Sequence, residues 1–364
     1  MLSRRQLFQL PAVAPFLSAA RSSAASRMNV LLIAVDDLNT RISPYFDPLV
    51  KTPNLDRLSS AGVRFERAYC NYPVCNASRT SLLSGKRPET TRVLGNSTPP
   101  RTYLGNVVML PEYFKAQGYF TARVGKIAHG LFEDAVRWDI SESRAGVPLR
   151  AAALTDEDDR KGGRAGKAGK AGRGGGGGVG LEWRATDNSD EREPDGATAR
   201  RIVQLIEQHK GKPQPFFLGC GFHKPHLPFV APRKYFDMYK LADIKFPNTP
   251  PDDRDDIPPI ALTHNPSDDK LTDKERREVI LGYHAATSFM DAQLGVVLDA
   301  MDRNKLWDST VVLLFGDHGW HLYDHLGLWR KMTVFEEAAH APLIVRTPGG
   351  RSGVASPRMV EFVD

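Results

Sequence analysis

The chain has 364 residues, of which 41% are hydrophobic and 25% are charged. This is ordinary for a soluble globular protein and excludes a fibrous or wholly disordered one. Its formal net charge is +6, but ten of the basic residues lie unopposed in two stretches, residues 1–27 and 160–180. Without those ten, 39 basic residues remain against 43 acidic ones, a balance of −4. We therefore expect no general polyanion-binding surface and no nucleic-acid partner.

Residues 1–27 are typical of an export leader. The pair Arg4-Arg5 precedes a short apolar segment, Leu10 to Ala20, which is rich in small residues at its end. The stretch resembles a twin-arginine signal peptide, and its apolar part is too short to span a bilayer. We expect an exported protein, periplasmic or extracellular, without a membrane span. A frayed amphipathic N-terminus is the alternative interpretation.

The first buried strand is predicted over residues 29–35 (NVLLIAV), a continuous apolar run that ends at Asp36 and Asp37. Such a run indicates a strand covered on both faces, as in the parallel sheet of an α/β domain. Ligands of open α/β sheets lie beyond the carboxyl ends of the strands, where both aspartates would project. Adjacent carboxylates repel each other, and a divalent cation relieves that repulsion. Two solvated turn aspartates are the alternative.

Two short helices follow in the chain. The first is predicted over residues 52–58, with a proline near its start. The second follows Ala77 and stops at Gly85, which places Cys75 at a helix N-terminus. Free N–H groups and the positive end of the helix dipole favour an anion there. The alternative is an ordinary buried cysteine beside a helix start.

The cysteines are too few for a disulfide framework in a chain of this length. They are Cys70, Cys75 and Cys220. One bridge is possible, and the cysteine left over would then be Cys75, which suits a cysteine reserved for chemistry. The sequence does not establish any pairing.

Ionisable residues follow the next predicted strand as well. A helix opens at Leu110 and closes near residues 117–118, and a strand is predicted over residues 119–124. Lys126 and His129 come directly after this strand, so both can point into the same crevice. A surface loop is the alternative.

The middle of the chain holds an insertion and a third strand with polar residues at its end. Residues 160–180 are a low-complexity run of Gly, Lys, Arg and Ala, which we interpret as a disordered surface insertion. Contact of this insertion with sulfated polysaccharide is the alternative. An amphipathic helix over residues 197–209 precedes the apolar run 216–219, and residues 222–229 (FHKPHLPF) follow, including His226.

The last third predicts a loop, a long helix and two strands. Residues 247–266 form a proline- and aspartate-rich loop, and residues 278–301 carry a helical apolar stripe that we interpret as core. A buried strand over residues 311–316 ends in Asp317-His318, and residues 342–345 are predicted as the last strand.

Together these elements predict an α/β fold with a mainly parallel central sheet flanked by helices. Four predicted strands end in acids or bases at the same kind of position, which independent accidents would not repeatedly produce. The set supplies a site for a hard cation and a group of cations around one nucleophile. Hydrolysis of a small dianionic ester requires such an arrangement.

Eight segments occur in an order that resembles a known family: VDDLN, TPNLDRL, CNASRTSLLSGKRPETTRV, PEYFKAQGY, VGKIAHG, FHKPHLPF, DHGWHL and PLIV. With them, residues 28–364, apart from the insertion, resemble the type I sulfatases of the alkaline phosphatase superfamily. Within that family the chain is most similar to the iduronate-2-sulfatase group. The resemblance implies hydrolysis of sulfate esters, on sulfated glycans, by a sulfatase domain that covers residues 28–364.

The resemblance also implies the chemistry of the site. Cys75 would be converted to formylglycine by a sulfatase-maturating enzyme, and its hydrated aldehyde would be the nucleophile. Arg79 would hold that residue in its hydrated form. One calcium ion would be bound by Asp36, Asp37, Cys75, Asp317 and His318. The sulfate would be surrounded by Lys126, His129, His226 and Lys331, with His129 and His226 as the two candidates for the acid that protonates the leaving alcohol.

Three departures from the family keep other functions open. Ala77 stands where the commonest family pentapeptide has proline, the insertion at 160–180 is peculiar to this chain, and a smaller C-terminal subdomain is expected to be missing. A choline sulfatase or a phosphonate monoester hydrolase of the same superfamily would share the nucleophile and the metal. A truncated, inactive fragment that binds anions or a metal is the alternative from a different class.

Overall fold

The computed structural model describes residues 27–144, 147–148, 180–263, 265 and 268–364. The expected leader, apart from Arg27, and the insertion, apart from Gly180, lie outside these residues, so the two predictions made for them stay predictions. No helix in the described part of the chain is both long enough and apolar enough to cross a membrane.

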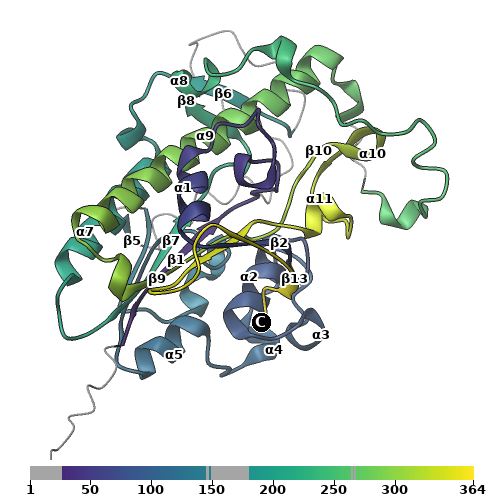
Figure 1. Ribbon diagram of the computed structural model, residues 1–364. Helices are drawn as coiled ribbons and strands as arrows, with labels where there is room; N and C mark the ends of the chain where they lie inside the picture. Colours follow the sequence, from purple (N-terminus) through teal and green to yellow (C-terminus); the bar gives the residue numbers. More distant parts are fainter. Residues whose placement is uncertain (1–26, 145–146, 149–179, 264, 266–267) are drawn as a thin grey trace, which may run out of the picture.

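A nine-stranded sheet forms the centre of the described structure, in the order β13-β2-β12-β9-β1-β7-β3-β4-β5 (Figure 1). Its strands are β1 (Asn29–Val35), β2 (Val63–Tyr69), β3 (Phe120–Gly125), β4 (Ile140–Arg144), β5 (Val147–Pro148), β7 (Phe216–Phe222), β9 (Thr310–Gly316), β12 (Leu343–Arg346) and β13 (Val354–Glu361). Strand β1 is parallel to β7 and β9, and β3 is parallel to β7 and β4, whereas β12 and β5 pair antiparallel with their neighbours. The predicted mainly parallel sheet is confirmed.

Helices cover both faces of this sheet because the central strands are apolar on both sides. On β1, Leu31 and Ile33 belong to the core shared with α1 (Pro53–Ala61), α7 (Pro194–His209) and α9 (Asp273–Arg303). The intervening Leu32 and Ala34 belong to the core on the opposite face. Elements on that face are α2 (Cys75–Ser84), α4 (Arg101–Leu104) and α5 (Leu110–Ala116). The alternation follows the period of two in a strand.

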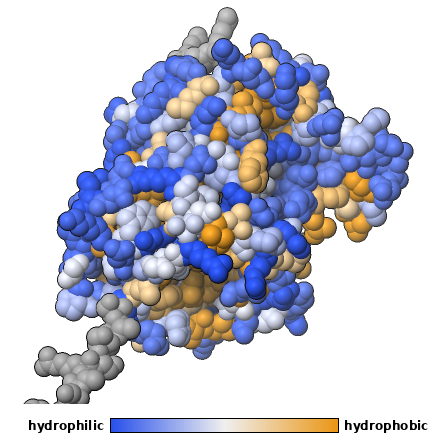
Figure 2. Space-filling view, in the orientation of Figure 1, coloured by the Kyte–Doolittle hydropathy of each residue, from blue (hydrophilic) through white to orange (hydrophobic). Residues whose placement is uncertain are grey.

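Smaller elements complete the fold. Two small sheets pair β6 (Trp183–Thr186) with β8 (Phe229–Pro232) and β10 (His321–Tyr323) with β11 (Leu328–Arg330). The remaining short α-helices are α3 (Pro88–Thr91), α8 (Arg233–Phe236), α10 (Asp324–Gly327) and α11 (Glu336–Ala339). The 3₁₀ turns are Ser43–Tyr45, Gly130–Ala135, Asp190–Arg192, Leu241–Asp243, Pro259–Ala261, Asp268–Lys270 and Trp307–Ser309. Figure 2 shows a mainly hydrophilic surface in this orientation, with hydrophobic side chains in small separate patches.

Several boundaries differ from the sequence expectations. Helix α9 begins at Asp273, five residues before the predicted stripe, because Thr272 and Glu275 form a capping box that starts it. The prediction that residues 342–345 are the last strand is wrong, since β13 follows them and pairs in parallel with β2. All three cysteines are free in the structure, so the possible disulfide is not formed.

Candidate active site

Four neighbouring parallel strands bring the predicted residues to one edge of the sheet. Strands β3, β7, β1 and β9 are adjacent and run in the same direction. Their carboxyl ends deliver six of the predicted site residues, which are Asp36, Asp37, Lys126, His226, Asp317 and His318, and they also deliver His223. Helix α2 presents Cys75 and Arg79 to the same edge, as the contacts below show.

Cys75 is the first residue of α2 and is fully buried. Its Sγ lies 3.3 Å from His318 Nε2 and 3.0 Å from Lys331 Nζ. Lys331 Nζ also lies 2.5 Å from Asp37 Oδ1. Burial, opposed by the charge of Lys331, raises the pKa of the Cys75 thiol well above its ordinary value. The unmodified cysteine is therefore a protonated thiol and a weak nucleophile.

Arg79 ties the acidic residues to the end of β3. Its guanidinium is buried and donates from Nε to Asp317 Oδ2 at 2.8 Å and from Nη2 to Asp36 Oδ1 at 3.2 Å. Nη1 donates to the carbonyl oxygens of Lys126 and Ile127 at 2.8 and 3.1 Å. Burial alone would lower the pKa of Arg79, but Asp317 and Asp36 raise it, so the side chain stays charged. One buried cation thus fixes two carboxylates and the Lys126 loop.

The three aspartates offer a donor set that fits a hard cation. Asp36, Asp37 and Asp317 are all fully buried, and Asp37 Oδ2 has no hydrogen-bond partner among the described residues. Burial, together with the charges of Asp36 and Asp317 and against that of Lys331, raises the pKa of Asp37 to about 8. Possible ligand atoms of Asp37, Cys75 and His318 lie within 4.8 Å of one another, as do those of Asp36, Cys75 and Asp317. Oxygen-rich sites of this kind suit Ca²⁺.

Two lysines neutralise these carboxylates. Lys126 Nζ lies 2.7 Å from Asp36 Oδ2, and Lys331 contacts Asp37. Burial would raise the pKa of Asp36, but Lys126 and the neighbouring cations hold it well below its ordinary value. Both lysines keep a raised pKa despite burial, through Asp36 for Lys126 and Asp37 for Lys331. One ammonium group, that of Lys331, therefore lies at the nucleophile position, and that of Lys126 lies at the neighbouring Asp36.

The histidines are held neutral and in defined orientations. Burial, followed by the charge of Lys126, lowers the pKa of His129 to about 2, and burial lowers that of His318 to about 4. His318 Nδ1 lies 2.8 Å from the Gly319 carbonyl oxygen, so the proton is on Nδ1 and the lone pair on Nε2 faces Cys75. His226 Nδ1 lies 2.6 Å from the Leu227 carbonyl oxygen, and its Nε2 lies 3.8 Å from Asp37 Oδ2.

Two buried carboxylates that the sequence did not single out hold the loops of the site. Asp195, on α7, accepts the backbone N–H groups of His223 and Lys224 at 2.9 and 2.8 Å. Glu133 accepts those of Ile127 and Ala128 at 2.9 and 3.0 Å. Neither residue belongs to a motif or follows a strand, so no local signal in the sequence marks them.

The backbone around Asp37 is held by a residue that we had interpreted only as core. Tyr283 belongs to the apolar stripe of α9, but its hydroxyl donates to the Asp37 carbonyl oxygen at 2.8 Å and accepts from Asn39 N at 2.9 Å. Asp37 itself has a φ of 59°, in the left-handed region that few side chains adopt. The hydroxyl stabilises this conformation, and the stripe supports the site as well as the core.

Lys331 reaches the site from a hairpin with an unusual backbone. Tyr323, His325, Leu326, Arg330 and Met332 all have positive φ values, between 48° and 80°. The hairpin is clamped by His325, whose Nδ1 lies 2.9 Å from Asp253 Oδ2 and whose Nε2 lies 3.3 Å from Glu337 Oε2. A hairpin outside the central sheet thus supplies the lysine at the nucleophile position.

Comparisons with known proteins agree with this architecture. A profile of the family described as Sulfatase matches residues 28–363. Human iduronate 2-sulfatase is 32% identical over 362 residues, which cover 94% of this chain and 64% of the relative. A sulfatase of Formosa agariphila is 34% identical, covering 92% of this chain and 67% of the relative. A choline-sulfatase of Rhizobium meliloti is 28% identical, covering 90% of this chain and 64% of the relative.

Solved structures show the same fold. The phosphonate monoester hydrolase of Agrobacterium radiobacter superposes with a TM-score of 0.74 at 21% identity, covering 93% of this chain and 72% of that one. The chain spans about two thirds of the length of the relatives it matches, 64% in the case of the human enzyme. Because the profile covers nearly all of residues 28–364 and human iduronate 2-sulfatase is 32% identical over 94% of the chain, the chain belongs to the sulfatase family.

Proposed function

We propose that this chain hydrolyses sulfate esters, with formylglycine made from Cys75 as nucleophile and one calcium ion as cofactor. The observation that carries the proposal is the position of Cys75, at a helix N-terminus, with Lys331 and His318 within 3.3 Å of Sγ and three buried aspartates beside it. A lone buried cysteine would need none of these charged neighbours. The charged set suits an ester that carries negative charge.

The metal would be held by the side-chain oxygens of Asp36, Asp37 and Asp317, with His318 and the modified Cys75 completing the set. The unsatisfied Asp37 Oδ2 and the mutual repulsion of the three carboxylates support this assignment. Bound calcium supplies Lewis-acid polarisation of the ester and of the nucleophile. Arg79 keeps Asp36 and Asp317 in place through its hydrogen bonds to both.

The chain's own cations would bind the sulfate group. Lys331 places an ammonium group at Cys75 and Lys126 places one at the neighbouring Asp36, where they can neutralise the sulfate oxygens. His129 and His226 are the candidates for the acid that protonates the leaving alcohol. A negative charge bound beside either neutral imidazole would raise its pKa toward the value that such a role needs.

Sulfated glycans of the iduronate type are the substrates that we propose. The identity to human iduronate 2-sulfatase is higher than that to the choline-sulfatase, and the chain carries the His-Lys-Pro-His segment and the Asp317-His318 pair. A choline sulfatase or a phosphonate monoester hydrolase is the second candidate, because relatives or structural neighbours with these names share the sequence or the fold. An inactive fragment that binds anions or a metal is the third candidate.

Export and maturation complete the proposal. The twin-arginine stretch in residues 1–27 supports a periplasmic or extracellular location. A sulfatase-maturating enzyme is the partner that the nucleophile requires, and it would have to accept Ala77 in place of proline. The side chain of Ala77 is fully buried in the structure, so this enzyme must act before the chain folds.

The first experiment is the mass of the tryptic peptide that contains Cys75, after co-expression with a sulfatase-maturating enzyme. Conversion of thiol to aldehyde lowers that mass by about 18 Da by atomic bookkeeping on the nucleophile chemistry. The matured protein is then assayed on an aryl sulfate, sulfated disaccharides, choline sulfate and a phosphonate monoester. An intact thiol, or a converted protein that turns over none of these, would contradict the proposal. Cys75→Ser protein is the control, because it cannot be converted.

A further inference from the structure

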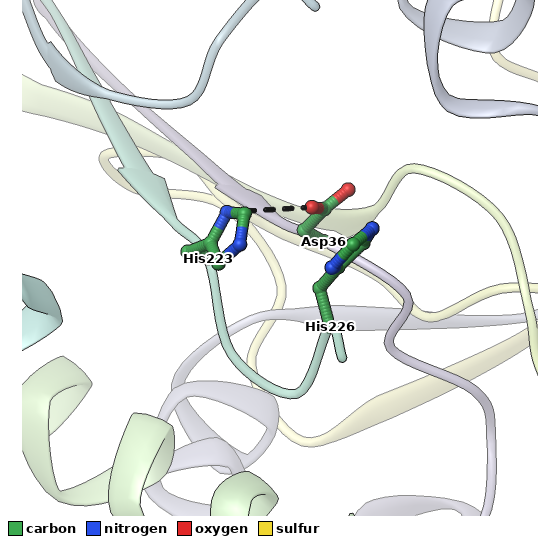
Figure 3. A group of neighbouring side chains, drawn as sticks. All are labelled: Asp36, His223 and His226. Atoms are coloured by element: carbon green, nitrogen blue, oxygen red, sulfur yellow. Dashed lines mark ion pairs between the residues drawn. The ribbon is translucent and has the colours of Figure 1, made fainter. Parts of the chain in front are cut away.

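A second group of potential metal ligands lies beside the proposed calcium site and includes a histidine that the proposed function does not use. It consists of Asp36, His223 and His226, whose ligand atoms all lie within 4.8 Å of one another. His223 Nδ1 is 3.7 Å from Asp36 Oδ2, and the ring centroids of His223 and His226 are 4.9 Å apart. Figure 3 shows the two rings on either side of the carboxylate.

The donor set differs in chemistry from that of the calcium site. Two imidazole nitrogens and one carboxylate oxygen suit Zn²⁺, Co²⁺ or Ni²⁺, whereas Ca²⁺ prefers a set in which oxygen ligands predominate, as in the proposed calcium site. The two sites share Asp36 but would select different ions. Calcium bound at the first site therefore leaves the second site with its preference for an ion of the zinc type.

The loop that carries both histidines is held in place before any ion binds. Asp195 accepts the backbone N–H groups of His223 and Lys224, and Lys224 Nζ donates to the carbonyl oxygens of His226 and Pro228 at 3.0 and 2.7 Å. The contact of His226 Nδ1 with the Leu227 carbonyl fixes the proton there, so the lone pair is on Nε2. Support of this kind orients metal-binding imidazoles in proteins.

The distances are near those that a metal ion needs. Ligand atoms about 2.1 Å from a tetrahedral ion lie roughly 3.4 Å apart. The His223–Asp36 distance of 3.7 Å is close to this, and the widest separation, at most 4.8 Å, closes by a small rotation of a side chain. Lys126 Nζ, 2.7 Å from Asp36 Oδ2, now neutralises the carboxylate, and the ion would take over that role.

We propose that Asp36, His223 and His226 bind one transition-metal ion of the zinc type beside the calcium site. Binding displaces Lys126 from Asp36 and engages His226. If the proposed function holds, both residues are then withdrawn from the sulfate, and zinc inhibits hydrolysis reversibly. Binding itself does not depend on that function.

The test is a titration of the calcium-saturated protein with Co²⁺, followed by visible absorption, and with Zn²⁺, followed by calorimetry. One ion per chain is expected to bind. His223→Ala is expected to weaken binding by more than about tenfold, the lower limit for loss of even a supporting partner. His209→Ala removes a histidine on α7 outside the group and is the matched control, with unchanged binding. In matured protein, zinc inhibition weakens with His223→Ala and persists with His209→Ala.

The same titration on Cys75→Ser protein separates this site from the thiol group formed by Asp37, Cys75 and His318. That variant cannot be matured, so binding to it tests the metal site even if the proposed hydrolase activity fails. Equal zinc affinity of the His223→Ala and unaltered proteins would overturn the proposal. Loss of zinc binding in excess calcium would also overturn the proposal, because the zinc would then lie at the calcium site. Loss of zinc binding in the Cys75→Ser protein would overturn it too, because the zinc would then lie at the thiol group.

Discussion

Lys331 Nζ lies 3.0 Å from Cys75 Sγ, although the two residues are 256 positions apart in the chain. The contact joins a helix that begins at the sheet edge to a hairpin outside the sheet. It places a permanent positive charge at the atom where we propose that the reaction occurs.

We expect Lys331→Met to lower kcat of the matured protein on an aryl sulfate by roughly 10²–10³, the usual effect of removing one preorganised donor of charge stabilisation. The conversion of Cys75, read from the peptide mass, should not change. Lys86→Met alters an exposed lysine just after α2 and should leave kcat unaltered. Equal kcat values for both variants would exclude the role of Lys331.

Asp195→Ala leaves two backbone N–H groups without their acceptor, the buried one of Lys224 and the partly buried one of His223. Each such group costs about 1–3 kcal/mol, so the free energy of unfolding should fall by at least about 2 kcal/mol. Asp195→Asn keeps one acceptor oxygen, so its free energy of unfolding should fall by less. Urea unfolding measures both. An unchanged midpoint for Asp195→Ala would show that water replaces the carboxylate.

Calcium should stabilise the fold, because three buried carboxylates lie together and Asp37 Oδ2 has no hydrogen-bond partner among the described residues. At about 100 times its dissociation constant, a ligand that binds only the folded state adds about 2.7 kcal/mol to the free energy of unfolding. We expect a calcium-dependent rise in Tm that EGTA reverses. Asp317→Asn should reduce that rise. A Tm that does not respond to calcium in the unaltered protein would argue against the site.

The clamp at His325 should make stability depend on pH. Burial would lower the pKa of His325, but its hydrogen bonds and ion pairs with Asp253 and Glu337 raise it. A raised pKa means that this stabilisation is fully present below the unfolded-state value of about 6.5 and is lost as pH rises through the folded-state value. His325→Asn should remove this part of the pH dependence, as thermal unfolding across that range would show. Parallel pH profiles for the two proteins would refute the assignment.

Much of the fold could be predicted because buried parallel strands are continuous apolar runs. The runs at 29–35 and 216–219, for example, correspond to β1 and β7. The alternation of apolar and charged residues in strand β2 (VRFERAY) is interrupted by the adjacent Glu66 and Arg67, and β13 (VASPRMVE) is an exposed edge strand with a proline. Neither pattern distinguishes a strand from a loop in a single sequence.

The site residues that directly follow buried strands were predictable as well, because those strands were. Asp36 and Lys126 follow strands directly, so the sheet itself brings them together. Asp195 and Glu133 act on backbone N–H groups of distant loops, and that role depends on tertiary packing alone. The catalytic and metal-binding roles of the predicted residues stay predictions until the variants are measured.

The left-handed backbone of the hairpin that carries Lys331 has a consequence for motion. Non-glycine residues in this conformation each cost about 1–3 kcal/mol, so the segment from Tyr323 to Met332 is held by its clamps rather than by local preference. Its opening free energy should be lower than that of the sheet, and its amides should exchange with solvent before those of β1. Local opening would remove the Lys331 charge from Cys75 while the remaining residues keep their positions, so the proposed activity would be lost without unfolding of the sheet.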